Sequence, residues 1–122
     1  MGYESRLYVV QKFDGSSFRD DGKCWAEVIA VFNLSKVYPV SNIIRNKYPD
    51  TNCYFNVFES DEDVVEDLYG SPLKEVPISD MIDILENAMQ KEDYRRFAPC
   101  LGLLKGFNPE EWDNLAVLHY GY

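Results

Sequence analysis

Residues 23–33, KCWAEVIAVFN, decide the fold. Their side chains alternate with the two-residue period of a β-strand, and both faces of that strand are apolar. One face carries Trp25, Ile29 and Val31, and the other carries Ala26, Val28 and Phe32. Because strands that are apolar on both faces are typically covered on both, we expect this segment to be a central strand of a sheet.

Two more strands are expected in the N-terminal half. Residues 3–12 alternate between apolar and charged side chains, which indicates a strand with one buried face. Residues 13–23 contain the turn formers DGSS and DDG, so the two strands are predicted to pair as a hairpin. Residues 53–58, CYFNVF, are aromatic and β-branched enough for a third strand.

Between these strands, a loop is expected at Val37–Val40 and one or two helical turns at Ser41–Asn46, ending before Pro49. The C-terminal half is expected to be mainly helical. Ser60 followed by Asp63 resembles a helix N-cap, so a short helix is predicted up to Tyr69.

Gly70 and Pro72 would end that helix, and Lys74–Ile78 would form a short strand or an extended connection. The clearest helix starts at Ser79 and runs to Arg95 or Phe97, before Pro99. Its apolar stripe is formed by Met81, Ile82, Ile84, Leu85, Ala88 and Met89.

A last helix is predicted from Pro109, which would occupy its first position. It would carry Trp112, Leu115, Ala116 and Leu118. Taken together, the pattern predicts a single α+β domain over residues 1–122, with a small antiparallel sheet from the N-terminal half packed against C-terminal helices. A chain of 122 residues is long enough for one such core.

The negative charge is concentrated in one segment. Residues 59–93 contain 12 of the 21 acidic residues and only two basic ones, Lys74 and Lys91, giving a formal charge of −10 in a chain of net charge −9. Such a field repels nucleic acid and anionic membranes and favours a basic protein partner.

The predicted binding site is a single acidic patch. It would form if the two predicted helices packed side by side, and it could resemble a row of phosphates to a protein that holds DNA or RNA. Its residues would be Asp63, Glu66, Asp67, Asp80, Asp83 and Glu86. The plainer interpretation is that these carboxylates keep a small domain soluble.

Two other functions remain open. A small metal-dependent enzyme could use Asp61 with Asp63, or Asp80 with Asp83, although Val65 interrupts the pattern of a calcium loop. Alternatively, the chain could be a structural or assembly subunit joined through Tyr38, Tyr48 and Tyr54. No phosphate-binding glycine motif is present, so we expect no cofactor.

The cysteines and the single histidine show no catalytic pattern. Cys24, Cys53 and Cys100 include no CxxC pair and are expected to be free thiols. His119 has no recognisable triad partner in the sequence, so a structural or surface role is expected. The sequence has no long apolar run and no basic, apolar leader at its start, which predicts a cytoplasmic protein.

The opening residues Gly2–Val10, GYESRLYVV, together with Ala26–Ala30, AEVIA, resemble small acidic, uncharacterised phage or prophage proteins. The resemblance covers about the first third of the chain and implies no residue roles. It implies an intracellular protein made during infection, in a group that includes inhibitors of host defence and of host nucleic-acid enzymes.

Overall fold

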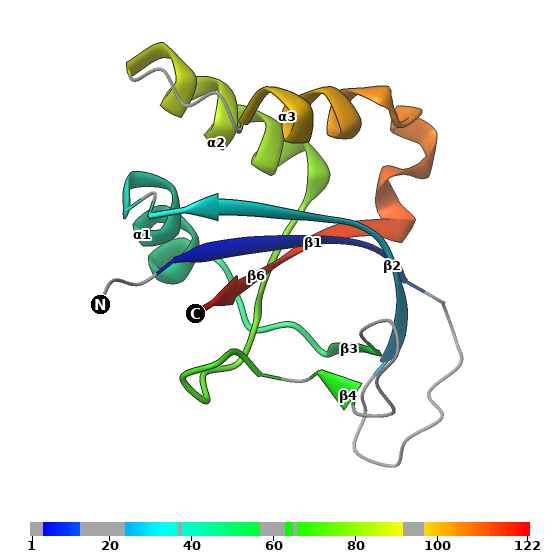
Figure 1. The fold of residues 1–122 in the computed structure, drawn as a ribbon. Helices are drawn as coiled ribbons and strands as arrows, with labels where there is room; N and C mark the ends of the chain where they lie inside the picture. The colour runs from blue at the N-terminus through cyan, green and yellow to red at the C-terminus, as the bar shows by residue number, and fades with distance from the viewer. Residues whose placement is uncertain (1–3, 13–23, 37, 57–62, 65, 92–96) are drawn as a thin grey trace.

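The computed structural model describes residues 4–12, 24–36, 38–56, 63–64, 66–91 and 97–122. Over these residues, the α+β class is confirmed, with helices packed on one face of a curled six-stranded sheet (Figure 1). The elements are β1 (Ser5–Lys12), β2 (Cys24–Ser35), α1 (Tyr38–Lys47), β3 (Cys53–Asn56), β4 (Asp63–Val64), β5 (Lys74–Val76), α2 (Ile78–Lys91), α3 (Phe97–Gly106), η1 (Pro109–Asn114) and β6 (Leu115–Gly121).

The strand order is β4-β3-β2-β1-β6-β5. The predicted pairing of the first two strands is confirmed, since β1 and β2 are antiparallel from Ser5↔Ser35 to Lys12↔Ala26. Their connection, residues 13–23, lies outside the described residues. The sheet is mixed, because β2 and β3 run parallel, and β6 brings the C-terminal residues between β1 and β5.

The sheet curls back on itself beside β5. The Thr51 N–H donates to the Leu73 carbonyl oxygen at 2.8 Å, and the Glu75 N–H donates to the Pro49 carbonyl oxygen at 3.0 Å. These bonds join the chain that leads into β3 to the far edge of the sheet. The curled sheet therefore has a concave face, and side chains pack against one another on that face.

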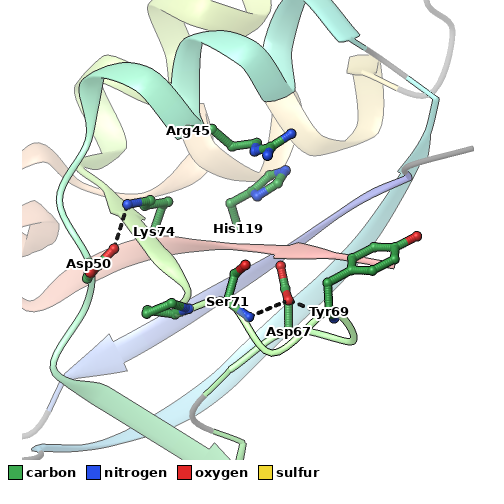
Figure 2. Close-up of a pocket in the computed structure, with 8 residues that line it drawn as sticks. Arg45, Asp50, Asp67, Tyr69, Ser71, Lys74 and His119 are labelled. Atoms are coloured by element: carbon green, nitrogen blue, oxygen red, sulfur yellow. Dashed lines mark hydrogen bonds and ion pairs between the residues drawn. The ribbon is translucent and has the colours of Figure 1, made fainter.

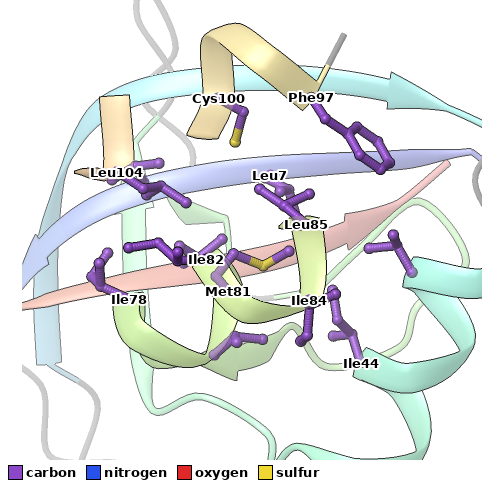
Figure 3. Packing of buried hydrophobic residues seen from close by; sticks show 14 of the residues in the cluster. Leu7, Ile44, Ile78, Met81, Ile82, Ile84, Leu85, Phe97, Cys100 and Leu104 are labelled. Atoms are coloured by element: carbon purple, nitrogen blue, oxygen red, sulfur yellow. The ribbon is translucent and has the colours of Figure 1, made fainter. Parts of the chain in front are cut away.

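Two hydrophobic cores result, one on each face of the sheet. The first lies between the sheet and the three α-helices, where Leu7 and Val9 of β1 meet α2 and α3 (Figure 3). The second fills the curl and includes Tyr8 and Val10. The expectation of one buried face on this strand is therefore wrong, because alternate residues of β1 serve both cores.

Strand β2 changes core partway along its length. Ala26 packs in the curl, whereas Leu34 packs under the helices. The β1–β2 register shifts between Val9 and Val10, which leaves Ile29 as an extra residue. One extra residue in a strand reverses which face the following side chains occupy, so the bulge transfers β2 from one core to the other.

Helix α2 confirms the stripe predicted by its 3.6-residue period. Met81 and Leu85 are fully buried, and Ile82 and Ile84 are nearly so. Figure 3 shows these side chains pointing into the layer between α2, α3 and the sheet. The expected extension of this helix over residues 92–96 lies outside the described residues.

Two predictions from the N-terminal half and the acidic segment are wrong. Residues 38–40 are not a loop but the first turn of α1, because Pro39 is tolerated at the start of a helix. The helix expected up to Tyr69 does not form: Asp63 and Val64 pair with β3, and Glu66 forms an isolated bridge with Pro72. The short strand at Lys74–Val76 is confirmed as β5.

The C-terminal prediction also requires correction. Pro99 does not end a helix but lies in the first turn of α3. The last expected helix is only the 3₁₀ segment Pro109–Asn114, and Leu115–Gly121 forms the strand β6. Because β6 is buried on both faces, its continuous apolar run satisfies a helical pattern as well as a strand pattern.

Candidate functional site

The carboxylates predicted to form one patch fall into two groups. Glu66 and Asp67 belong to the chain that connects β4 to β5, whereas Asp80, Asp83 and Glu86 lie on α2. In Figure 1 that connection lies below α1 and α2 lies above it. The two helices that would have placed these residues side by side are not both present, so the structure does not bring the two groups together.

The remaining member of the predicted patch, Asp63, has its backbone in β4, and its side chain lies outside the described part of the structure. On α2, Asp80 Oδ2 accepts a 3.0 Å hydrogen bond from the Tyr48 hydroxyl, and Glu86 Oε1 is 3.4 Å from Lys105 Nζ. Asp83 is exposed. Part of the negative charge of α2 is therefore balanced within the protein.

Asp67 organises a tight turn. Its Oδ1 accepts hydrogen bonds from the backbone N–H groups of Tyr69 at 2.9 Å and Ser71 at 3.0 Å. The Asp67 N–H donates to the Ser71 carbonyl oxygen at 2.8 Å, and Gly70 has a φ of 78°, a conformation that glycine adopts without strain. A side chain that binds its own backbone in this way rigidifies the turn.

The same turn is anchored to the sheet and exposes two large apolar side chains. The Leu68 N–H donates to the Gly121 carbonyl oxygen at 3.1 Å. Leu68 is 66% exposed and Tyr69 is 56% exposed, the highest values among the large hydrophobic residues that the structure describes. We call Glu66–Ser71 the apolar turn, because it presents this pair in a braced conformation.

Beside the apolar turn lies a hollow of about 530 Å³ (Figure 2). Figure 2 shows Arg45 reaching over it from α1, Lys74 and His119 entering from the sheet, and Tyr69 at its rim. Segments far apart in the sequence therefore converge there. Its lining residues are Arg45, Asp50, Asp67, Tyr69, Ser71, Pro72, Lys74 and His119.

The charges at the hollow nearly balance. Lys74 Nζ is 2.5 Å from Asp50 Oδ1, and Asp67 accepts the two backbone hydrogen bonds of the turn. Arg45 is exposed on the opposite wall and adds a second positive charge. The hollow is thus lined by two cations and two carboxylates and has no strong preference for either sign.

His119 is the most buried polar group of this site, with only 2% of its surface exposed. Its Nε2 lies 2.9 Å from Ser5 Oγ. Burial lowers the pKa of His119 from 6.5 to about 4, and Arg45 acts in the same direction, while Asp67 opposes both. The imidazole is therefore neutral at pH 7, which agrees with the structural role expected from the sequence and not with a surface role.

A second polar cluster lies at the end of the curl. Thr51 Oγ1 donates to Glu75 Oε1 at 2.7 Å, and Lys12 Nζ is 3.1 Å from Glu75 Oε2. Burial alone would raise the pKa of Glu75, but these two donors outweigh it and lower the pKa. Cys53 Sγ, 3.7 Å from Glu75, has its own pKa raised by burial. The cluster thus links β5, through Glu75, to the end of β1 and to the segment that leads into β3.

The two cysteines whose side chains the structure describes are not placed for catalysis. Cys53 and Cys100 are free thiols, as expected, and both are buried; the side chain of Cys24 lies outside the described residues. Burial raises the pKa of Cys100 to about 12, so its thiol stays protonated at pH 7.

The structure describes some of the residues on which a metal-dependent enzyme or an assembly subunit would depend. Across the described ranges, no three His, Cys, Asp or Glu residues are grouped to hold a metal ion, and Asp61 falls outside those ranges. Tyr54 is buried and Tyr48 is half-buried, while the side chain of Tyr38 is not described. No helix among the described residues is long and apolar enough to cross a membrane.

Comparison of the chain with protein-family models, with curated proteins and with solved structures gives no match. The sequence places Asp67 in the predicted site, but it does not indicate the hollow, the position of His119 in it, or the exposure of Leu68 and Tyr69. The DLYGSP run at residues 67–72 contains the Asp, Gly and Pro of a turn, and that signal could have identified the apolar turn.

Proposed function

We propose that this chain is a protein-binding module that recognises a basic partner, with the apolar turn as its contact site. The observation that carries the proposal is the exposure of Leu68 and Tyr69 in a turn braced by Asp67. Aromatic and apolar side chains on a turn whose backbone is held in one conformation before binding make effective anchors, because less backbone entropy is lost on association. The hollow beside Tyr69 offers room for a side chain of the partner.

The preference for a basic partner comes from charge. The hollow itself is nearly neutral, but the segment that contains the apolar turn carries a formal charge of −10. A field of this kind accelerates the approach of a positive surface and acts beyond direct contact. The carboxylates on α2 contribute to it although they lie apart from the turn.

Proteins that bind nucleic acids expose basic surfaces, so this class supplies the partner that we propose. The resemblance of the N-terminal third to phage proteins favours the role of an intracellular inhibitor, one that occupies such a surface in the host. In this role the chain needs no cofactor and makes no direct contact with nucleic acid or membrane.

Affinity capture from a bacterial lysate, followed by mass spectrometry, tests the proposal. The unmodified chain should retain a specific basic protein, and added salt should weaken that capture because salt screens the attraction. The double variant Leu68→Ala/Tyr69→Ala should lose this protein with an unchanged circular dichroism spectrum. Ile43→Ala, which truncates an exposed apolar residue of α1, is the matched control and should retain it.

Charge reversal outside the apolar turn tests the long-range electrostatic attraction separately from the direct contact. Asp83→Lys, at an exposed position of α2 outside the apolar turn, should slow association with the captured protein more than it accelerates dissociation. Capture that is insensitive to salt, or that persists in the Leu68→Ala/Tyr69→Ala variant, would contradict the proposal.

A further inference from the structure

Cys24 and Cys53 lie opposite each other in the sheet, although α1 separates them in the sequence. Cys24 is the first residue of β2, and Cys53 is the first residue of β3. The two strands are parallel, and Cys24 pairs with Cys53 in their register. Neighbouring strands lie about 4.8 Å apart, and two cysteines can be bridged when their Cα atoms are about 4.4–6.8 Å apart. The backbone therefore brings these two positions within disulfide range.

Both positions belong to the concave face of the sheet. Cys53 packs in the second core, which lies on that face, and so does Ala26 of β2. Alternate residues of a strand share a face, and the bulge of β2 at Ile29 comes after this segment. The register position of Cys24, two residues before Ala26, is thus on the same face as Cys53. Cys100 packs in the first core, on the opposite face of the sheet, and is not a competing partner.

The structure describes Cys53 in its reduced form, as a free thiol. Its side chain is fully buried, and its Sγ lies 3.7 Å from Glu75 Oε1. Burial raises the pKa of this thiol, and the neighbouring Glu75 carboxylate acts in the same direction. An oxidant in solution therefore reaches and reacts with Cys53 only poorly. Cys53 is suited to a second step, in which it reacts with a sulfur on a neighbouring residue.

We propose that Cys24 and Cys53 form a reversible disulfide in the presence of an oxidising disulfide, such as glutathione disulfide. The Cys24 thiolate attacks glutathione disulfide, which breaks its S–S bond, forms a mixed disulfide at Cys24 and releases one glutathione thiolate. The Cys53 thiolate then attacks the Cys24 sulfur, which forms the Cys24–Cys53 bond and releases the second glutathione thiolate. The two released thiolates take up the two protons that the cysteines lose, and two electrons pass to the oxidant.

The disulfide strengthens a narrow junction of the sheet. Within the described residues, β2 and β3 pair only at Cys24–Cys53 and Trp25–Tyr54. A bond at the first of these pairs closes the chain that runs through α1 into a loop, which restricts the unfolded chain and fixes β3 against β2. Oxidised protein should therefore be more stable than reduced protein. This modification is separate from the apolar turn and does not depend on the proposed function.

Mass spectrometry of the full chain, equilibrated in glutathione buffers, tests the proposal. Reduced protein is equilibrated at several ratios of oxidised to reduced glutathione, its remaining thiols are blocked with iodoacetamide in urea, and it is digested with trypsin. The three cysteines then lie on separate peptides, residues 24–36, 48–74 and 97–105. A disulfide should join peptides 24–36 and 48–74, and peptide 97–105 should carry the blocked thiol of Cys100.

The same equilibration in urea shows whether the fold brings the pair together. The native chain should form the bond at a ratio of oxidised to reduced glutathione that is about tenfold or more lower than the unfolded chain requires, because the register holds the two cysteines near each other. Oxidised protein should also unfold at a higher urea concentration than reduced protein.

Two serine variants separate this pair from a general effect of oxidation. Cys24→Ser removes the partner of Cys53, so the oxidant should no longer raise the urea midpoint. Cys100→Ser is the matched control, and it should form the same link and show the same shift as the unmodified chain.

Two results on the unmodified chain overturn the proposal, and both stand even if a serine variant does not fold. The first is the absence of a link between peptides 24–36 and 48–74 in native protein, or its formation just as readily in urea. The second is a link that joins two chains, which gel electrophoresis without reductant detects as a species of twice the mass.

Discussion

The buried histidine should make the protein lose stability as the pH falls through the mildly acidic range. In the native state the pKa of His119 is lowered from 6.5 to about 4 because the ring is buried. Below pH 6.5 the unfolded chain binds a proton at this position and the native chain does not, so protonation favours unfolding. The stabilisation is fully present above pH 6.5 and is lost as the pH falls to about 4.

The size of the effect follows from the two pKa values. A difference between 6.5 and about 4 corresponds to about 3 kcal/mol of free energy of unfolding, a large fraction of the stability of a small domain. Urea unfolding, measured by tryptophan fluorescence at a series of pH values from 7 to 4, gives this quantity directly.

His119→Gln is the matched control, since its amide can still bond to Ser5 and it has no group that titrates in this range. The carboxylates titrate in both proteins, so the difference between the two pH profiles isolates the imidazole. Profiles that run parallel between pH 6.5 and pH 4 would show that His119 is not held neutral by burial.

Three further changes have expected outcomes, each measured by urea unfolding. Leu85→Ala removes a fully buried side chain of α2 and should lower the free energy of unfolding by about 2–5 kcal/mol, whereas Leu68→Ala at the exposed turn should change it by less than about 0.5 kcal/mol. In Gly70→Ala the new Cβ meets no atom within 4 Å, but the alanine must adopt a positive φ, which should lower the free energy of unfolding by about 1–2 kcal/mol. Gly102→Ala has equal space but lies inside α3, so it should raise the free energy of unfolding by about 0.5–1 kcal/mol. Equal effects of the two changes would refute the role of backbone conformation. Glu75→Ala removes the acceptors for the Thr51 hydroxyl and the Lys12 ammonium and should destabilise by about 1–3 kcal/mol. Glu75→Gln should lose less, because its one carbonyl oxygen still accepts from one of these two donors; equal losses would contradict this reasoning.

The parts of the fold that could be predicted from sequence are those with one dominant period. Helix α2 shows a clean 3.6-residue stripe, and the hairpin of β1 and β2 shows alternation on both sides of a turn-rich segment. In these segments local propensity and tertiary packing agree, so the pattern identifies the element.

The predictions that failed concern segments whose sequence pattern fits both a helix and a strand. Ser60 and Asp63 match a helix cap, but no long apolar stripe follows them, and pairing of Asp63–Val64 with β3 prevails. β6 is apolar at consecutive positions because its side chains enter both cores, so its sequence pattern predicts a helix as readily as a strand.

The candidate site could be predicted only in part. The acidic character of residues 59–93 is a property of composition and needs no structure. The hollow, by contrast, is lined by residues from distant parts of the sequence, such as Arg45 of α1 and His119 of β6. It forms only because the sheet curls. Convergence of distant segments leaves no local signal in a single sequence.

The position of β6 between β1 and β5 has a consequence for synthesis of the chain. Ser5 of β1 and His119 of β6, whose side chains are hydrogen-bonded, are 114 residues apart in the sequence. The ribosome therefore synthesises β1 long before β6, the strand with which it pairs. Until then the nascent chain exposes β1 to misassociation, and pairings between such distant residues form slowly. Cells that make this protein quickly would benefit from a chaperone that shields its first strands during translation.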